Sequence, residues 1–139
     1  MRKILNLTQH VATPEQKAQG VVDLDEDRRK ILTNLLIFEE IPSLYELKER
    51  AFLIANLCYG EAPDYYLPHE EEGGALLYNY AMIGGAPFFM STLEKELLRR
   101  GITPLYAFSK RESIEELQPD GSVWKTQVFR HVGFVEVSQ

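Results

Sequence analysis

The chain has 139 residues, of which 45% are hydrophobic and 26% charged, a composition typical of one globular domain with its own core. The net charge of −6 argues against a protein that binds duplex nucleic acid, and no apolar run approaches the ~20 residues of a membrane span. The single cysteine excludes an internal disulfide, and no signal peptide is predicted. We therefore expect one cytoplasmic domain over residues 1–139 that does not bind a membrane.

A strand and a short helix are predicted first. Lys3–Leu7 is an apolar segment of strand length. Thr13 is a favourable N-cap for the helix, Pro14 suits its first turn, and Gln16 completes a capping box with Thr13. We expect this helix to end near Gly20, because glycine commonly follows the last helical turn.

Two longer helices are predicted next. Asp23 or Asp25 caps the first of them, and Pro42 ends it. Ser43 opens a second capping box, and the helix that follows presents one apolar stripe. The stripe consists of Leu44, Leu47, Ala51, Ile54 and Cys58. We interpret Cys58 as a buried structural thiol rather than a nucleophile.

The segment Tyr59–Gly74 is predicted to be a long loop, because it is rich in proline, glycine and acidic residues. Two interpretations remain open. Its tyrosines, Tyr59, Tyr65 and Tyr66, could cover a pocket, or the segment could be a solvated connection.

The centre of the predicted fold is a strand, a turn, a helix and a second strand. Ala75–Ile83 is almost continuously apolar, as expected of a strand buried on both faces. A Gly-Gly turn at 84–85 follows it, and the next helix begins at Pro87 and ends before Gly101. Thr103–Phe108 is the second strand. A unit of this length predicts a right-handed crossover between parallel strands.

The carboxy-terminal part is predicted to be antiparallel. Ser113–Leu117 and Ser122–Arg130 flank a Pro-Asp-Gly turn, which is typical of a β-hairpin. Val132–Val137 continues the second strand or bends at Gly133. The predicted class is α/β: a small Rossmann-like, mostly parallel sheet with a C-terminal antiparallel β-hairpin extension.

Three segments follow the ends of predicted strands, and they meet at one edge of the sheet if the first strand lies parallel beside the central one. The order of the strands in the sheet is not derivable from the sequence. Small residues admit a ligand to the backbone, helix starts favour anions, and basic side chains complement phosphate. The G-x-G-x-x-G dinucleotide pattern is absent. A tight glycine turn and a solvated strand end are the plainer alternatives. The segments are Thr8, Gln9 and His10; Gly84 and Gly85; and Ser109, Lys110 and Arg111.

The three histidines differ in context. His10 follows a strand end and could act as a general acid or base. His131 lies in a predicted strand beside Arg130, and a structural role remains the alternative for both histidines. His69 lies in the acidic loop, where Glu70–Glu72 lacks metal-ligand spacing toward a histidine. We therefore predict neither a metal nor a cofactor.

Short motifs match a known family. A Pro-x-Tyr-Ala-x-x-Lys-Arg strand end is followed by a glutamate, a Asp-Gly-Ser turn and a Phe-Arg-His-Val-x-Phe string. With these motifs the chain resembles a small CRISPR-associated accessory family of type III systems, which is Rossmann-like and related to the CARF domains. The matching residues are Pro104, Tyr106, Ala107, Ser109, Lys110, Arg111, Glu115, Asp120, Gly121 and Phe129–Phe134, and, more loosely, His10, Thr13, Gln16 and Gly85.

The resemblance has limits and consequences. The family has Gln-Gly-Asp where this chain has Gly-Gly-Ala, and Val21–Gly74 has no match. The resemblance implies a homodimer that binds a cyclic oligoadenylate, such as the tetra-adenylate, and that slowly cleaves it without metal as a ring nuclease. It implies attack by a ribose 2′-OH on the adjacent phosphodiester. The implied catalytic residues are His10, Lys110 and Arg111, and the candidate ligand-binding residues are Thr8, Gln9, Gly84, Gly85, Ser109, Arg130 and His131.

Two other functions remain open. The chain could be a non-catalytic module that binds a nucleotide or a protein, which the loss of polar side chains at the glycine turn favours. It could instead be an interaction protein of a phage or another mobile element that dimerises through its sheet edge. The acidic net charge and the apolar carboxy-terminal string are compatible with that role.

Overall fold

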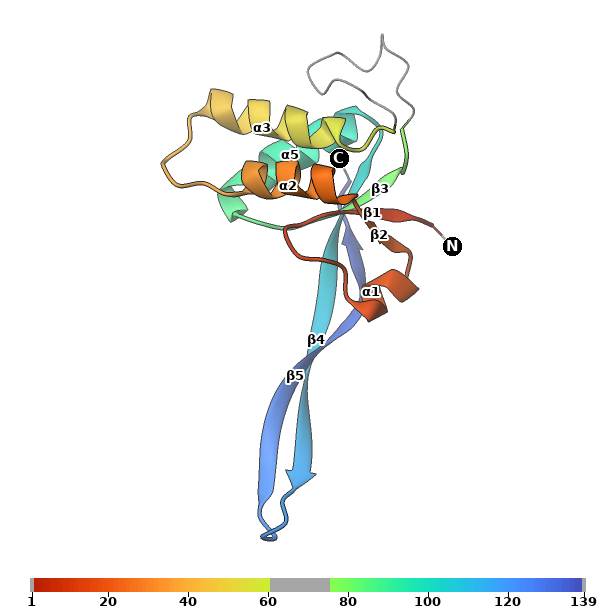
Figure 1. Ribbon diagram of the computed structural model, residues 1–139, viewed down its shortest axis with the longest axis vertical. Helices are drawn as coiled ribbons and strands as arrows, with labels where there is room; N and C mark the ends of the chain where they lie inside the picture. Colours follow the sequence, from red (N-terminus) through yellow and green to blue (C-terminus); the bar gives the residue numbers. More distant parts are fainter. Residues whose placement is uncertain (1, 61–75, 139) are drawn as a thin grey trace.

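The computed structural model describes residues 2–60 and 76–138, which form a five-stranded sheet in the order β2-β1-β3-β4-β5 (Figure 1). The first four strands are parallel, and β5 is antiparallel to β4. The predicted α/β class, with a mostly parallel sheet and an antiparallel hairpin extension, is confirmed. The strands are β1 (Ile4–Leu7), β2 (Val21–Asp23), β3 (Tyr80–Ile83), β4 (Thr103–Leu117) and β5 (Val123–Glu136).

Three helices begin directly after the capping residues that the sequence predicted. Thr13 and Gln16 form the expected capping box, and the side chains of Asp25 and Ser43 accept hydrogen bonds from the first turns of their helices. No described helix is both long enough and apolar enough to cross a membrane. The helices are α1 (Pro14–Ala18), α2 (Glu26–Leu36), α3 (Leu44–Asn56) and α5 (Pro87–Arg99).

Several predicted boundaries were wrong. β2 was not expected, because a strand of 3 residues is too short to show a period. α2 ends at Leu36, well before Pro42. β3 covers only the last 4 residues of the predicted Ala75–Ile83 strand. Most of the predicted Tyr59–Gly74 loop, with Tyr65, Tyr66 and His69, lies outside the described residues.

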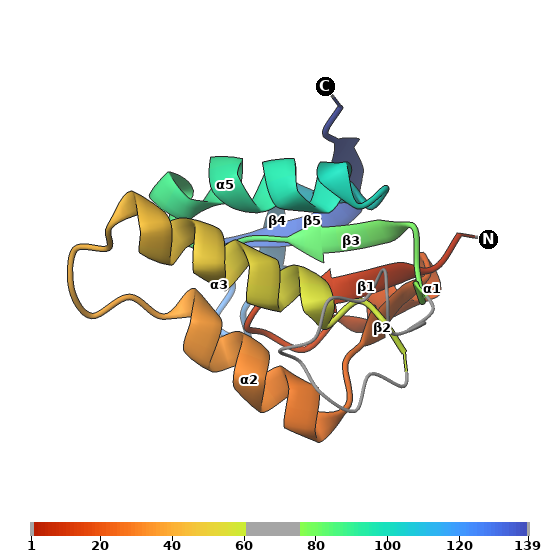
Figure 2. The ribbon, with the colours of Figure 1, turned by 90° about the horizontal axis from the view of Figure 1, so that it is seen from above.

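The core lies on both faces of the sheet because alternate strand residues point to opposite sides. Leu5, Leu7, Ala81 and Ile83 belong to the larger cluster, which α2, α3 and α5 cover. Figure 2 shows these three helices lying together over one face of the sheet. A smaller cluster on the other face, beside α1, consists of Ile4, Ala12, Val21, Met82 and Leu105.

The connections of the sheet diverge from the pair β1 and β3. The chain leaves β1 through α1 for β2 on one side, and it leaves β3 through α5 for β4 on the other side. The helices α1 and α5 lie on opposite faces (Figure 1), as two crossovers of the same hand must when they run in opposite directions. The gap between β1 and β3 is therefore a topological switch point, where open α/β sheets bind ligands at the carboxyl ends of their strands.

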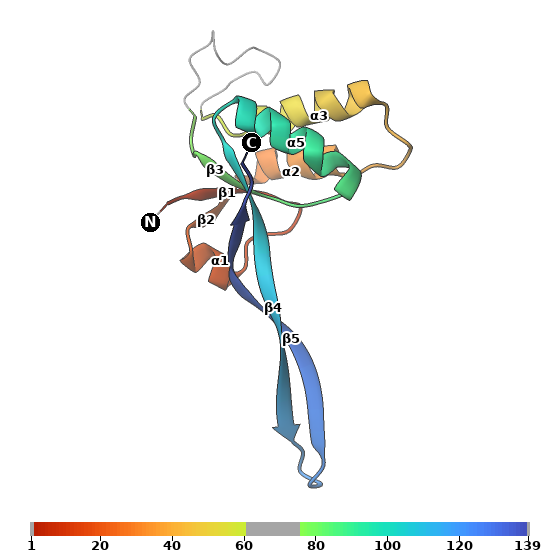
Figure 3. The ribbon, with the colours of Figure 1, turned by 180° about the vertical axis from the view of Figure 1, so that it is seen from behind.

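β4 and β5 continue far beyond the rest of the sheet as a two-stranded ribbon (Figures 1 and 3). We call the part formed by residues 109–132 the arm. The sequence predicted two separate strands before the turn, but β4 is one strand of 15 residues. The pairing register shifts between Phe108 and Ser109, which leaves Val132 as an extra residue of β5. Gln19, which caps α1, donates from Nε2 to the carbonyl oxygen of Val132 at 3.1 Å and ties this bulge to the domain.

Replacing a core leucine should destabilise the fold far more than replacing an exposed one. Leu97 of α5 is 0% exposed, whereas Leu44 of α3 is 62% exposed. We expect Leu97→Ala to lower the free energy of unfolding by about 2 to 5 kcal/mol because it leaves a cavity. Leu44→Ala should change it by less than about 0.5 kcal/mol. Urea denaturation followed by circular dichroism measures both, and equal losses would contradict the described core.

Candidate functional site

A hollow of about 610 Å³ lies at the switch point, over the carboxyl ends of β1 and β3. Three segments form its walls: the loop after β1 with the start of α1, the turn after β3, and β4 at the level where the arm begins. This is the edge at which the sequence predicted a ligand site. The lining residues are Thr8–Val11, Thr13, Gln16, Met82–Gly85, Tyr106 and Ala107.

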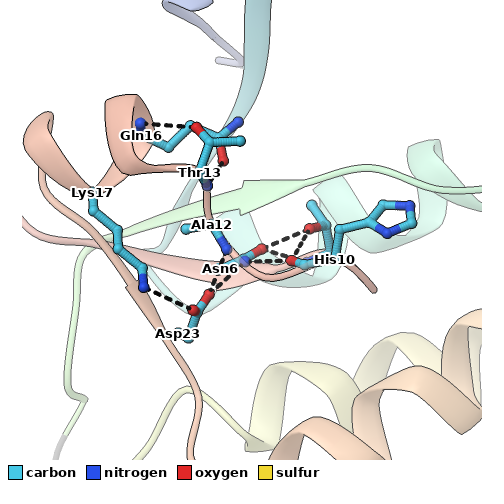
Figure 4. Close-up of polar contacts among 8 residues, drawn as sticks. Asn6, His10, Ala12, Thr13, Gln16, Lys17 and Asp23 are labelled. Atoms are coloured by element: carbon cyan, nitrogen blue, oxygen red, sulfur yellow. Dashed lines mark hydrogen bonds and ion pairs between the residues drawn. The ribbon is translucent and has the colours of Figure 1, made fainter.

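The loop after β1 is held by one buried side chain, Asn6, which is 3% exposed (Figure 4). Its Nδ2 donates to the carbonyl oxygen of His10 and to Oδ1 of Asp23, each at 2.7 Å. Its Oδ1 accepts from the backbone N–H of Thr8 at 2.9 Å and from the Thr8 hydroxyl at 2.7 Å. Asp23 Oδ1 also accepts from the Ala12 N–H at 3.0 Å. The amide therefore joins β1, β2 and the loop into one unit.

This network leaves the imidazole of His10 available to a ligand. Only the backbone oxygen of His10 contacts Asn6, and the ring points away from the hydrogen-bonded group (Figure 4). His10 is exposed and lines the hollow, and its ring makes no hydrogen bond to any described residue. The structure thus presents an imidazole on a fixed backbone, as a general acid or base requires.

The turn after β3 brings bare backbone to the hollow. Gly85 has φ +153°, and a Cβ there would lie 3.4 Å from Cε of Met90. A Cβ on Gly84 would meet Thr8 Cγ2 at 3.6 Å, an ordinary contact. Ala86 caps α5 without a side-chain hydrogen bond to the first turn of the helix. Such a helix start favours an anion.

Tyr106 forms a fixed part of the wall rather than an acid or base. Its hydroxyl donates to the carboxylate of Glu94 in α5. Burial raises the pKa of Tyr106 above its ordinary value, and the hydrogen bond and charge of Glu94 raise it further. The hydroxyl therefore stays protonated at neutral pH.

The other predicted site residues lie on the arm, outside the lining of the hollow. Met82 of β3 is level with Leu105 of β4, so Lys110 lies about 16 Å farther along the strand at ~3.3 Å per residue. The structure therefore brings together Thr8, Gln9, His10, Gly84 and Gly85, and it places Ser109, Lys110, Arg111, Arg130 and His131 beyond them.

Three of these arm residues already have partners within the chain. The guanidinium of Arg111 lies 5.4 Å from the centre of the Phe129 ring. Arg130 Nε is 3.1 Å from Oε2 of Glu112, and His131 Nε2 is 2.8 Å from Oε1 of Gln19. These contacts give the three side chains a structural role in the arm.

Among the described residues, those that line the hollow carry neutral polar groups, apolar groups and one imidazole, and none of them is acidic, a lysine or an arginine. In the described residues, no group of three His, Cys, Asp or Glu side chains is placed to hold a metal ion. Such a lining suits the bases, riboses and single phosphates of a nucleotide better than a densely charged ligand.

Sequence reasoning missed the two residues that shape the loop, Asn6 and Asp23. Asn6 is the one polar residue inside the apolar string Ile4–Leu7. A polar residue in a buried strand must find hydrogen-bond partners, so this position was a usable signal. The sequence offered no comparable signal for Asp23, because its hydrogen bonds to Asn6 and Ala12 depend on the pairing of β1 with β2.

Replacing the Asn6 amide with a carboxyl should destabilise the protein in a pH-dependent way. Asn6→Asp removes both donated hydrogen bonds and places a carboxylate beside Asp23, so we expect a loss of about 3 kcal/mol or more near neutral pH. Burial and the neighbouring charge raise the pKa of the introduced carboxyl above its unfolded value. The loss should therefore be smaller near about pH 5 than near about pH 8.

The matched comparison is Thr8→Val, which removes only the hydroxyl that bonds to Asn6 Oδ1. It should lower the free energy of unfolding by about 1 kcal/mol, without the same dependence on pH. Urea denaturation at several pH values measures both variants. Equal, pH-independent losses would show that the amide does not organise the loop.

The two glycines of the turn should respond differently to alanine. Gly85→Ala should destabilise the protein by about 1 to 3 kcal/mol, because its backbone conformation is unfavourable for a residue with a Cβ. Gly84→Ala should change stability by less than about 0.5 kcal/mol, since the added methyl makes an ordinary contact. Thermal and urea unfolding of the pair test this, and equal stability of the variants would contradict the described turn.

Comparison with known protein families gives a match over residues 2–135, to the family described as the Uncharacterized protein MJ1673 family. No curated protein and no solved structure matches the chain. The family description names no activity, ligand or partner. The resemblance to the CRISPR-associated family therefore stays a prediction.

Proposed function

This chain belongs to the MJ1673 family, and we propose that its switch-point hollow binds a nucleotide of the cyclic oligoadenylate class. The position of the hollow carries the proposal, because open α/β sheets bind ligands at this point of their topology. The ligand class rests on the motifs that resemble the CRISPR-associated family and on a lining suited to a nucleotide.

The walls suggest how a nucleotide would lie. A phosphate would approach the bare backbone of the Gly84–Gly85 turn, which lies in the wall of the hollow just before α5 begins. The hydroxyl of Thr8 and the amide of Gln9 would bond to ribose or base. About 610 Å³ is the size of a site for a drug-sized ligand. One hollow would thus enclose part of a cyclic oligonucleotide and leave the rest of the ring outside.

Cleavage of the bound ring is the second candidate function, and the unbonded imidazole of His10 favours it. In this reaction the ribose 2′-oxygen forms a bond to the adjacent phosphorus while the bond from phosphorus to the 5′-oxygen breaks. His10 would take the proton from the 2′-OH, and the departing 5′-oxygen would take a proton from solvent water, leaving a 2′,3′-cyclic phosphate and a 5′-hydroxyl. The proposed charge-neutralising role of Lys110 and Arg111 lacks support from the lining, which excludes them. Binding is therefore better supported than turnover.

We also infer a cytoplasmic location. Cys58 is a buried free thiol, and burial raises its pKa to about 12. Such a thiol needs no oxidising compartment for its structural role.

Thermal unfolding with and without cyclic tetra-adenylate tests the proposal, with linear tetra-adenylate as the matched ligand. A ligand present at a hundred times its Kd stabilises the folded state by about 2.7 kcal/mol, so a clear rise in Tm is expected for the ring. Isothermal calorimetry then gives the affinity. Absence of binding to either ligand would overturn the proposal.

Variants of the hollow locate the binding site in the same assays. Gly84→Ala adds a methyl to the wall and should weaken binding with little change in stability. Lys30→Ala alters an exposed residue of α2 that does not line the hollow, and it should leave the affinity unchanged. Chromatography of the products separates binding from cleavage: His10→Ala should slow any ring opening by about 10²- to 10⁴-fold. Ring opening that His10→Ala does not slow would remove the role given to His10.

A further inference from the structure

The arm is a two-stranded ribbon with little support from the rest of the chain. Beyond the level of Ile83, β5 is the only described strand that pairs with β4, and β5 is the edge strand of the described sheet. Figures 1 and 3 show the ribbon projecting away from all the described helices except α1, which lies at its base. An isolated two-stranded ribbon is marginally stable in water, and its free edges and faces favour association.

Large apolar side chains are concentrated on β4 and β5 in the arm and at its base. Eight of the sixteen exposed large hydrophobic residues in the described chain lie there, including Trp124, which is 63% exposed. Exposed apolar side chains favour association. In the paired part of the arm, Ile114 and Trp124 lie on one face, and Leu117, Val123 and Phe129 lie on the other face. The eight are Phe108, Ile114, Leu117, Val123, Trp124, Phe129, Val132 and Val135.

Opposite charges lie at opposite ends of one face of the arm, which we call the tryptophan face. At its base Lys110 of β4 is directly across from Arg130 of β5, and like charges in this position repel. Glu112 neutralises Arg130, whereas Lys110 has no ion pair with a described residue. Near the tip Glu116 also has none and lies across from Trp124. The tryptophan face consists of Lys110, Glu112, Ile114, Glu116, Trp124, Thr126, Val128 and Arg130.

We propose that two copies of the chain dimerise by packing their tryptophan faces together with the arms antiparallel. The two-fold axis lies in the interface, perpendicular to the arms and at the level of the pair Ser113 and Gln127. It places β4 of one copy over β4 of the other, and β5 over β5. Lys110 then faces Glu116 of the partner subunit. Arg130 faces the partner subunit's Trp124, where a guanidinium and an indole attract each other.

The same charges disfavour two alternatives for the tryptophan face, a parallel dimer and duplex nucleic acid. A parallel arrangement of two arms would bring the basic ends together and the acidic ends together. Residues 109–132 carry as many acidic as basic side chains, four of each, so the arm lacks the excess positive charge with which proteins bind duplex nucleic acid. A second copy in the antiparallel arrangement satisfies both ends of the face at once.

Charge reversal tests the arrangement, because the two-fold axis makes the contact between Lys110 and Glu116 occur twice, once from each copy to the other. Lys110→Glu places two acidic residues opposite each other twice in the dimer, and Glu116→Lys does the same with two basic residues. Each should weaken dimerisation of the full-length chain by about tenfold or more, as measured by sedimentation velocity. The double variant K110E/E116K restores both attractive pairs, and so does an equimolar mixture of the two single variants. Both should dimerise about as strongly as the wild type.

Fluorescence provides a second readout because Trp124 is the only tryptophan in the sequence. Dilution of the wild type should shift its emission to longer wavelengths as the indole becomes exposed, over the concentrations at which the mass falls to that of the 16.0 kDa chain. Lys30→Glu on α2 is the control charge reversal and should leave dimerisation unchanged. Circular dichroism verifies that each variant is folded.

Three results would overturn the proposal. The wild type could be monomeric at every concentration, or the single charge reversals could leave the dimer unchanged. The double variant could also dimerise no better than the single variants. Each result is independent of whether the hollow binds a nucleotide, so failure of this proposal leaves the proposed function to its own test.

Discussion

The buried amide of Asn6 is the constraint on which the site depends. A side chain with two donors and an acceptor oxygen is stable inside a sheet only when its hydrogen-bonding capacity is used. Asn6 uses it on both sides of β1, with Asp23 of β2 on one side and the loop that carries Thr8 and His10 on the other. Because an unpaired buried amide would be unfavourable, these hydrogen bonds fix the position of the loop. Asn6 therefore ties one wall of the hollow to the sheet.

The sequence predicted best what short-range chemistry determines. Thr13, Asp25 and Ser43 begin helices because their side chains satisfy N–H groups three residues away. The parallel pairing of β3 with β4 across α5 followed from the crossover rules, whereas the place of β1 beside β3 was only assumed. Properties that depend on partners distant in the sequence were not accessible, and the 3-residue strand β2 is the clearest case.

The position of Lys110 and Arg111 shows why the candidate site was predicted only in part. Sequence reasoning ended the last parallel strand at Phe108, where apolar residues give way to polar ones. In the structure the strand passes through this change without a break, because β5 pairs with it along nearly its whole length. A polar sequence can remain extended when a neighbouring strand supplies its backbone hydrogen bonds. Because β4 does not end at Phe108, Lys110 and Arg111 lie farther along the strand and outside the lining of the hollow.

The extra residue at Val132 has a consequence for how the arm can vary. Because side chains alternate along a strand, an unpaired residue in one strand of the ribbon changes which residues of that strand share a face with a given residue of its partner strand. The bulge has already made one such change at the base, and its contact with Gln19 fixes where it occurs. Lengthening or shortening the ribbon would therefore preserve the orientation of its tip only in steps of two residues per strand. The bulge thus determines which residues of β5 share a face with which residues of β4 in the arm.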